Sequence, residues 1–391
     1  MKADVAVIGA GPIGLSFACA LAAHGLSVVL IDKQPLDALR EPAFDGREIA
    51  LTHATQDILK RLGIWAHIDA ADMYPLRDAR VFNGASNAFS MHIASGREPE
   101  REPLGVFVSN YLLRKACFAA ATAYPGITLL QATLQEIDTN EHGARLQLAD
   151  GTRIRATLAV AADSRFSSTR RQMGIAAQMR DNGRTMMVGR MWHAVPQERC
   201  AWEWFGYGQT LARLPLGDHC SSVVLSLPNR EMDELLALDD DAFAAHIAQR
   251  FDHCLGEMRK QSEMHTYPLV SVYAERFVAQ RFALIGDAAV GMHPVTAHGF
   301  NLGVQGQWRL AQNILAAHAR RQDIGAPGVL SRYQREHRMA TRPFYLASQA
   351  IVSLYTDDRL PAQLLRHAGL QIAQRTAPVK AMIAHHLMQR R

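Results

Sequence analysis

A glycine-rich segment at residues 9–14, GAGPIG, constrains the fold more than any other feature of the chain. The apolar run before it predicts a buried strand, and residues 13–24 have the composition of a helix that ends at Gly25. A second apolar run, LSVVLI at 26–31, predicts another strand, with Asp32 at its end. Strand, glycine loop, helix and strand in this order form the βαβ unit that binds a dinucleotide. The sequence therefore predicts an α/β protein with a Rossmann-like domain.

Each glycine of this segment has a separate task. Gly9 allows the tight turn, Gly11 lets the backbone approach a pyrophosphate, and Gly14 lets helix and strand pack closely. The carboxylate of Asp32 can accept a hydrogen bond from a ribose hydroxyl. The motif itself does not distinguish NAD from FAD. No second motif of this kind follows, because GYG at 206–208 lacks the spacing. Proteins with two separate Rossmann units are therefore disfavoured.

A second loop, GDAAVGMHPVTAHGFNLG at 286–303, lies more than 250 residues later. The segment RFALIGDAA predicts a short strand before it, and residues 301–319 have helical spacing. Asp287 can accept hydrogen bonds from a ribityl chain, and the helix beginning near Gly299–Asn301 can stabilise negative charge on a reduced ring. NAD has no ribityl chain, so two loops that hold the two ends of a dinucleotide favour FAD.

The motif GDAA…HP…GFNLG resembles the second FAD loop of the single-component FAD aromatic hydroxylases, which share the fold of para-hydroxybenzoate hydroxylase. Within that group the chain looks most like the ubiquinone-biosynthesis hydroxylases. The segments that carry the likeness are 44–65, 161–175, 200–218 and 267–289, and the similarity is collinear over roughly 3–350. The variants DGREIALTH, AADSRFSSTRR and VTAHGFN look nearest to the 5-demethoxyubiquinol hydroxylase branch.

The resemblance implies a reaction and a set of contacts. NADPH or NADH would reduce FAD, O₂ would add at C4a of the flavin, and the hydroperoxide would hydroxylate a polyprenylated phenol or quinol. The residues that would hold FAD lie in the first loop, in the arginine and acidic motifs that follow it, and in the second loop. They are Gly9, Gly11, Pro12, Gly14, Asp32, Lys33, Arg47, Arg114, Asp163, Gly286, Asp287, Pro294, Gly299, Phe300 and Asn301.

The chain departs from the family pattern at three places. The usual Asp-Gly pair is Asp163-Ser164, which keeps the carboxylate and is expected to change the turn. His298 replaces a glutamine, and Gly306 stands where an acidic residue is usual. These departures bear on substrate and reductant more than on flavin binding.

The resemblance also implies a discontinuous FAD domain with an inserted mixed or antiparallel sheet and a helical C-terminus. We expect FAD-binding parts at 1–73, 105–180 and 268–330, substrate-domain parts at 74–104 and 181–267, and a helical segment at 331–391. Strand-like alternation at 184–195, 200–216 and 219–228 supports the sheet and puts Trp202 and Trp204 on one face. Such a sheet would either roof the flavin and line an apolar pocket or serve packing alone. The candidate substrate-lining residues are Trp204, Tyr207, Gln209 and Thr296.

His298 is the one candidate for a catalytic group, because an imidazole beside the flavin could shuttle a proton. The competing interpretation, which we favour, is a loop histidine that shapes the pocket. His385 and His386 are adjacent rather than one helical turn apart, so no metal site is expected. The five cysteines are widely spaced and indicate neither a zinc site nor a disulfide.

The charge of the chain is concentrated in its last segment. The net charge is +5, and residues 359–391 contain six basic residues and no acidic one. One interpretation is a solvated basic helix; another is docking on an anionic membrane surface or an acidic partner such as a ubiquinone-biosynthesis complex. No motif for nucleic acid occurs. The N-terminal segment fits a signal peptide poorly and no other stretch is apolar enough to span a bilayer, so we expect a cytoplasmic protein. It would be peripheral at the inner membrane surface if the tail docks there.

Overall fold

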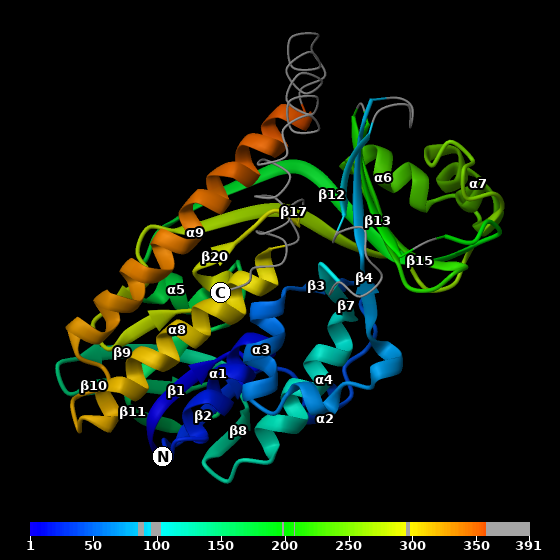
Figure 1. Ribbon diagram of the computed structural model, residues 1–391. Coiled ribbons are helices and arrows are strands. Elements are labelled where there is room, and N and C mark those ends of the chain that lie inside the picture. Colours follow the sequence, from blue (N-terminus) through cyan, green and yellow to red (C-terminus); the bar gives the residue numbers. More distant parts are fainter. Residues whose placement is uncertain (85–89, 95–102, 198, 207, 295–297, 357–391) are drawn as a thin grey trace.

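The computed structural model describes residues 1–84, 90–94, 103–197, 199–206, 208–294 and 298–356. Two large sheets and a small one make up the described chain (Figure 1). The N-terminal sheet lies at one end with helices α1, α4 and α8 around it, and the second sheet arches over it, with helices α6 and α7 beyond (Figure 1).

The first sheet has eight strands, five of them parallel in the order β19-β11-β1-β2-β8. Its central strand pairs Val5 with Leu158 on one side and with Val28 on the other, and the side chain of Val5 is fully buried. Parallel strands of such a sheet are buried on both faces, so β1, β2 and β19 are mainly apolar and buried. The strands are β1 (Lys2–Ile8), β2 (Val28–Asp32), β8 (Ile127–Gln131), β9 (Leu134–Asn140), β10 (Gly143–Leu148), β11 (Arg153–Ala161), β18 (Val278–Ala279) and β19 (Phe282–Leu284).

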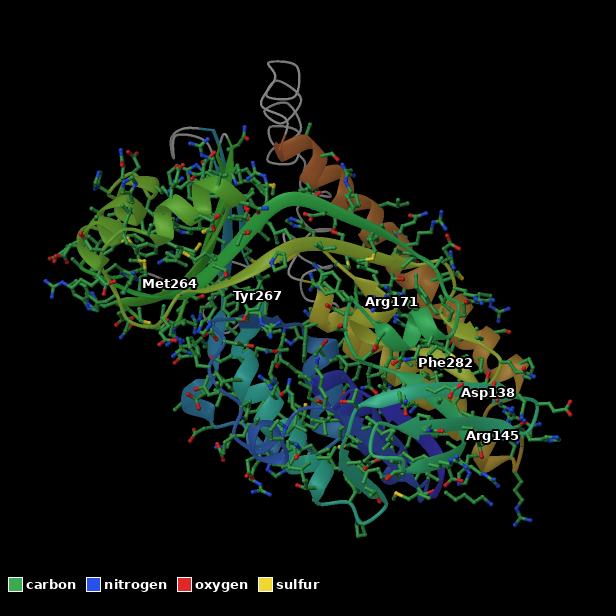
Figure 2. The ribbon with its side chains drawn as sticks, turned by 180° about the vertical axis from the view of Figure 1, so that it is seen from behind. Asp138, Arg145, Arg171, Met264, Tyr267 and Phe282 are labelled. Atoms are coloured by element: carbon green, nitrogen blue, oxygen red, sulfur yellow. The ribbon has the colours of Figure 1, made fainter. Side chains whose placement is uncertain are left out.

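Strands β9 and β10 extend this sheet as an antiparallel pair beside β11. Asp138 on β9 is paired with Arg145 on β10, and Figure 2 shows both residues at one edge of the molecule. The opposite charges of this pair favour the register.

The second sheet has nine strands in the order β20-β17-β12-β15-β14-β13-β5-β6, with β16 beside β12. The 17-residue strand β12 pairs with β15 and with β17 and gives the sheet its long arch (Figure 1). Helices α6 (Asn229–Leu236) and α7 (Asp240–Arg250) pack on its outer face. The strands are β5 (Asp78–Asn83), β6 (Ser90–Ala94), β12 (Ala177–His193), β13 (Cys200–Gly206), β14 (Gln209–Pro215), β15 (Cys220–Pro228), β16 (Met258–Lys260), β17 (His265–Ala274) and β20 (Val290–Gly291).

A three-stranded sheet of β3 (Glu48–Leu51), β7 (Gly105–Ser109) and β4 (Tyr74–Leu76) lies between the two large sheets. Apolar side chains of β7 and of the inner face of the second sheet form a separate core cluster that includes Phe107 and Leu216. This small sheet therefore closes the space beneath β13 and β14.

The helices connect the layers. They are α1 (Pro12–Ala22), α2 (Leu36–Arg40), α3 (His53–Arg61), α4 (Asn110–Thr122), α5 (Ser168–Gln172), α8 (Gly299–Ala319) and α9 (Pro327–Thr356). The long helix α9 spans both sheets: the hydroxyl of Tyr333 donates to the carbonyl of Leu284 at 2.7 Å, and Thr341 Oγ1 lies 3.2 Å from Tyr273 Oη. No helix among the described residues is both long and apolar enough to cross a membrane.

The expected elements occur with small shifts in their bounds. The helix expected at 13–24 is α1, the helix expected at 301–319 is α8, and the strands expected at 184–228 form antiparallel pairs. The domain boundaries stay a prediction, but two strands cross them. Strand β4, expected in the substrate domain, pairs with β7, and β17 runs across the expected boundary between residues 267 and 268.

Candidate active site

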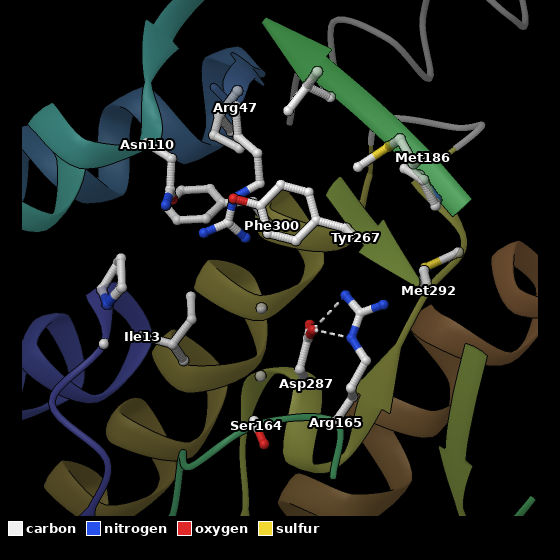
Figure 3. A pocket seen from close by; sticks show the side chains of 18 of the residues that line it. Ile13, Arg47, Asn110, Ser164, Arg165, Met186, Tyr267, Asp287, Met292 and Phe300 are labelled. Carbon is white, nitrogen blue, oxygen red and sulfur yellow. Dashed lines mark hydrogen bonds and ion pairs between the residues drawn. The ribbon is translucent and has the colours of Figure 1, made fainter. Parts of the chain in front are cut away.

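A cavity of about 710 Å³ runs between the N-terminal sheet and the arch of the second sheet. One end is lined by residues 9–13 and Asp32, and the middle by residues of the second loop and by Arg47 and Tyr267 (Figure 3). The far end is lined by the inner face of β12, β13, β14 and β15. Figure 2 places Tyr267 where β17 reaches over the N-terminal part of the chain.

The first loop has the geometry that its glycines predict. Gly9 has a φ of 106°, and a Cβ there would lie 2.5 Å from the carbonyl oxygen of Ala162. A Cβ on Gly14 would lie 2.0 Å from the carbonyl oxygen of Gly9, so this residue packs helix against strand and does not line the cavity. A Cβ on Gly11 would meet nothing within 4 Å, which leaves room for a ligand beside the backbone.

Asp32 holds this loop in place. Its Oδ2 accepts a hydrogen bond from the amide of Ala10 at 2.7 Å, and its Oδ1 accepts from the amide of Gln34 at 2.9 Å. The Gln34 side chain in turn accepts from Arg114 Nη2 at 3.2 Å, and all three of these side chains line the cavity. Lys33 is exposed and does not line the cavity, so the expected contact with the cofactor has no support there.

The second loop lies against the first. The side chain of Ile13 packs between Gly286 and Gly303, where added Cβ atoms would lie 3.2 and 3.1 Å from it. Asp287 Oδ2 accepts hydrogen bonds from Arg165 Nη2 at 2.9 Å and Nε at 3.2 Å (Figure 3). The remaining expected residues of this loop that line the cavity are Pro294, Gly299 and Phe300.

Asn301 does not line the cavity. Its Oδ1 accepts from the amide of Thr52 at 3.0 Å, and its Nδ2 donates to the carbonyl of Ala50 at 2.8 Å. The side chain thus joins α8 to β3, because it lies on the buried side of the first helical turn. These bonds give Asn301 a supporting role beside the second loop, and its expected contact with the flavin stays a prediction.

His298 lies at the N-terminal end of α8, is buried, and does not line the cavity. Its ring is stacked on that of Phe344 in α9, with 5.3 Å between the ring centres. This position supports the interpretation of a histidine that shapes the loop over that of a proton shuttle. His293, which we did not expect in the site, lines the cavity instead, and burial together with Arg165 and Arg184 lowers its pKa to about 4.

Arg47 and its neighbours add positive charge to the middle of the cavity. Arg47 Nη2 pairs with Asp45 at 2.6 Å, and its guanidinium lies 5.0 Å from the centre of the Tyr267 ring. Asn110 Nδ2 also donates to Asp45, at 2.7 Å. With Arg114 and Arg165, three guanidinium groups line the part of the cavity that an anionic cofactor would occupy.

Glu48 and Arg190 form a buried ion pair beside the cavity. The side chain of Glu48 is fully buried and accepts from Arg190 at 2.9 Å and from the Ser109 hydroxyl at 2.7 Å. Burial raises the pKa of Glu48, against the lowering influence of Ser109 and Arg190. The pair links β3 to β12, so it fixes the small sheet against the second sheet.

The two other departures from the family pattern, at Asp163-Ser164 and at Gly306, can also be placed in the structure. Asp163 lines the cavity and accepts from the hydroxyl of Thr169 at 3.0 Å, and Ser164 after it has a φ of 155°, which glycine adopts more readily. Beside Gly306 the space for a side chain is filled: a Cβ would lie 2.5 Å from the buried imidazole of His337. The acidic residue usual at 306 would have no room in this chain.

Two of the expected substrate-lining residues lie elsewhere. Trp204 is buried in the outer core and donates from Nε1 to the carbonyl of Gly84 at 3.0 Å, and the side chain of Gln209 is bonded to Arg250. Successive side chains of a strand point to opposite faces, so the neighbours of these residues line the cavity instead. Tyr207 and Thr296 lie outside the described residues.

The side chain that takes the expected place of Trp204 is Glu203, which lines the far end of the cavity. The alternation of β13 puts residue 203 on the face opposite Trp202 and Trp204, but it does not tell which of the two faces meets the cavity. No cluster of three or more metal-ligating side chains occurs among the described residues.

This set of residues fits FAD. The backbone at Gly11 is open to a pyrophosphate, the carboxylates of Asp32 and Asp287 lie at the two loops, and three arginines offset negative charge. The fold is that of flavin-dependent monooxygenases: p-nitrophenol 4-monooxygenase PnpA from Pseudomonas putida superposes with a TM-score of 0.79 at 17% identity, over 100% of this chain and 99% of that one.

The sequence comparisons define the family. The FAD binding domain family matches residues 2–343. The chain is 42% identical to ubiquinone hydroxylase UbiM of Neisseria meningitidis, over 99% of this chain and 85% of that protein. It is 27% identical to 3-demethoxyubiquinol 3-hydroxylase of Escherichia coli, over 96% of each. The protein belongs to the ubiquinone-biosynthesis FAD hydroxylases and is an FAD-dependent monooxygenase. The narrower 5-demethoxyubiquinol branch stays a prediction, since the identity to UbiM is the higher of the two.

Proposed function

We propose that the protein hydroxylates the aromatic ring of a polyprenylated phenol or quinol in ubiquinone biosynthesis, with NADPH or NADH as reductant and O₂ as co-substrate. The observation that carries the proposal is the single cavity that joins the FAD loops to an apolar sheet face. Met186, Val188, Leu214 and Val224 line that face. An apolar wall of this kind suits a lipophilic ring better than a small charged one.

The residues of the chain have distinct tasks in this reaction. Bound FAD supplies the electron transfer and the activation of oxygen. Arg47, Arg114 and Arg165 would offset the charge of the bound cofactor, and the N-terminal end of α8 near Gly299 would stabilise negative charge on a reduced flavin. Residues of β12 and β17 line the cavity, and excluding water there would slow the unproductive decay of activated oxygen.

A proposed branch of the family also names the ring carbon that is hydroxylated. Hydroxylation of a 5-demethoxyubiquinol is our specific proposal, and it is supported by the motif variants DGREIALTH and VTAHGFN. Incubation with short-chain demethoxyquinols under ¹⁸O₂, followed by mass spectrometry, tests it. Incorporation of one labelled oxygen at that carbon is the expected result, and label at another carbon would reassign the branch.

The basic segment 359–391 is the proposed contact with the membrane, where a polyprenylated substrate resides. It lies outside the described residues, and its support is charge alone: six basic and no acidic residues. Co-sedimentation with anionic liposomes, for the full chain and for a chain ending at residue 358, tests this. Salt-sensitive binding that disappears on truncation is expected. Equal binding of both chains would point to a solvated tail or to docking in a protein complex.

The central test is the flavin spectrum of the purified protein. We expect flavin absorption that bleaches under anaerobic conditions when NADPH or NADH is added, faster with a prenylated phenol present. Faster bleaching with a small soluble phenol alone would favour the alternative of a hydroxylase of soluble phenols. A protein that binds FAD and oxidises no reduced nicotinamide with any phenol would favour a flavoprotein scaffold in a biosynthetic complex.

A further inference from the structure

Glu203 stands on β13 with its side chain toward the cavity. Its neighbours Trp202 and Trp204 belong to the core on the outer face, where Phe82 and Phe251 pack against them. Because side chains alternate along a strand, Glu203 points to the inner face, and it lines the far end of the cavity. A carboxyl group thus stands on the wall that faces the substrate.

The surroundings of Glu203 follow from the register of the second sheet. Residue 203 pairs with Val81 on β5 and with Ala212 on β14, and Ala212 pairs with Val224 on β15. Val224 pairs with Val188 on β12. Directly paired residues are close neighbours on one face, so the carboxyl is flanked by a row of small apolar side chains.

The polar groups nearest in the sheet do not satisfy this carboxyl. Thr210 and Ser226, also on the cavity wall, bond to each other at 2.5 Å. Arg80 and Arg213 occupy alternate positions on the flanking strands, and Arg213 lies over the ring of Trp202 on the outer face. Glu203 carries no hydrogen bond or ion pair in the described part of the chain.

Burial without a partner raises the pKa of Glu203 to about 8. The carboxyl is then protonated near neutral pH and can both donate and accept a hydrogen bond. A buried polar group without a partner is destabilising, so this side chain lowers the stability of the fold unless a ligand completes its hydrogen bonds.

We propose that Glu203 hydrogen-bonds an oxygen substituent of the substrate's aromatic ring and thereby selects uncharged phenols and quinols over phenols that carry a carboxylate. This inference rests on the proposed function and names the chemical class of its substrate. The bond holds the ring at the far end of the cavity, so Glu203 is a binding and specificity-determining residue.

The distribution of charge in the cavity supports this selectivity. Arg47, Arg114 and Arg165 line the end and middle of the cavity, the part that FAD would occupy. At the far end, the described lining residues on β12 to β15 are apolar or hydroxyl-bearing apart from Glu203. A substrate carboxylate placed there would lose its hydration without gaining a cation, which is strongly unfavourable. A hydroxyl or methoxy oxygen has no such penalty.

Three variants of the FAD-loaded enzyme test the inference: Glu203→Leu, Glu203→Gln, and Glu263→Gln as an exposed control that does not line the cavity. The ligands are a 2-methoxyphenol with one isoprene unit and 4-hydroxybenzoate. The dissociation constant of each is measured from the perturbation of the flavin absorption, together with the FAD content and the thermal midpoint of each variant.

We expect Glu203→Leu to weaken binding of the prenylated phenol about fivefold to tenfold, as loss of one neutral hydrogen bond predicts. FAD content should stay unchanged and the thermal midpoint should stay equal or rise. Glu203→Gln should restore most of the affinity, because an amide also donates and accepts, and Glu263→Gln should bind as the parent does.

Unchanged affinity of Glu203→Leu for the prenylated phenol overturns the inference. It is also overturned if Glu203→Leu binds the phenol more weakly only because the variant has lost FAD and thermal stability. A parent enzyme that binds 4-hydroxybenzoate more tightly than the prenylated phenol overturns the selectivity and the proposed substrate together. A parent that binds the prenylated phenol while Glu203→Leu binds it equally well leaves the proposed function standing and removes Glu203 from it.

Discussion

Arg165 and Asp287, which lie 122 positions apart in the chain, form a two-point ion pair inside the cavity, with Nη2 and Nε both donating to Oδ2 (Figure 3). Arg165 also donates from Nη1 to the carbonyl of Val270 at 3.0 Å. One guanidinium therefore ties the second FAD loop to β17, so Asp287 is fixed in position before any ligand arrives.

We expect Arg165→Met to weaken FAD binding about tenfold, because a charge-assisted bond that positions Asp287 is worth about 1–2 kcal/mol when partly exposed. Titration of the apoprotein with FAD, followed by flavin fluorescence, measures this. Arg230→Met is the matched control, since it removes an exposed pair with Glu234 on α6. Equal losses in both variants would show that the position of Arg165 is unimportant.

The glycines of the first loop should separate folding from binding. The Cβ added in Gly11→Ala would contact no protein atom, so the apoprotein should keep its thermal midpoint. The same Cβ would occupy the space beside the pyrophosphate, so the affinity for FAD should fall about tenfold or more. Gly14→Ala places a Cβ 2.0 Å from the Gly9 carbonyl oxygen and should destabilise the apoprotein by about 1–3 kcal/mol. Calorimetry of both apoproteins and FAD titration distinguish the two effects. A lower apoprotein midpoint in Gly11→Ala would contradict this assignment.

Gly306 should resist substitution because His337 fills the adjacent space. Alanine in a helix interior gains about 1 kcal/mol over glycine, but overpacking against a buried ring costs about 1–3 kcal/mol. We therefore expect Gly306→Ala to lower the free energy of unfolding, measured with urea. The double variant Gly306→Ala with His337→Ala should lose less free energy of unfolding than the two single variants lose together. Simple additivity would mean that the two residues do not interact.

Glu203 should make stability depend on pH. Its pKa is raised from 4.5 in the unfolded chain to about 8 in the fold. Between these values the folded state holds a proton that the unfolded state releases, so stability is highest below pH 4.5 and falls as pH rises toward 8. Glu203→Gln lacks this loss and should gain stability over the parent from pH 5 to pH 8. Thermal midpoints across this range check it, and a constant difference would refute it.

Trp204 should matter for stability and not for the substrate. Trp204→Phe keeps most of the packing in the outer core and removes the bond to the Gly84 carbonyl, which is worth about 1 kcal/mol. The free energy of unfolding should fall by roughly that amount, while KM for the phenol stays unchanged. A raised KM in a variant that is as stable as the parent would indicate that Trp204 lines the cavity.

Local patterns determined much of this protein. The βαβ unit, α8, the acid-capped helix α7 and the alternation of β13 follow from glycine spacing and from periods of 3.6 and 2 along the chain. Asp239 at the N-cap of α7 accepts from the amide of Ala242 at 2.8 Å, as an acidic residue directly before a helix commonly does. The two FAD loops were also evident, because each carries its own strand, turn and helix.

Only the tertiary structure decided which side of each element faces the cavity. The alternation of β13 groups Trp202 with Trp204, but both faces of this strand are covered, so periodicity cannot say which one meets the substrate. The bond of Asn301 to β3, the pair of Arg165 with Asp287 and the place of His337 beside Gly306 join distant segments. Such contacts depend on how sheets and helices pack, and no local pattern encodes that packing.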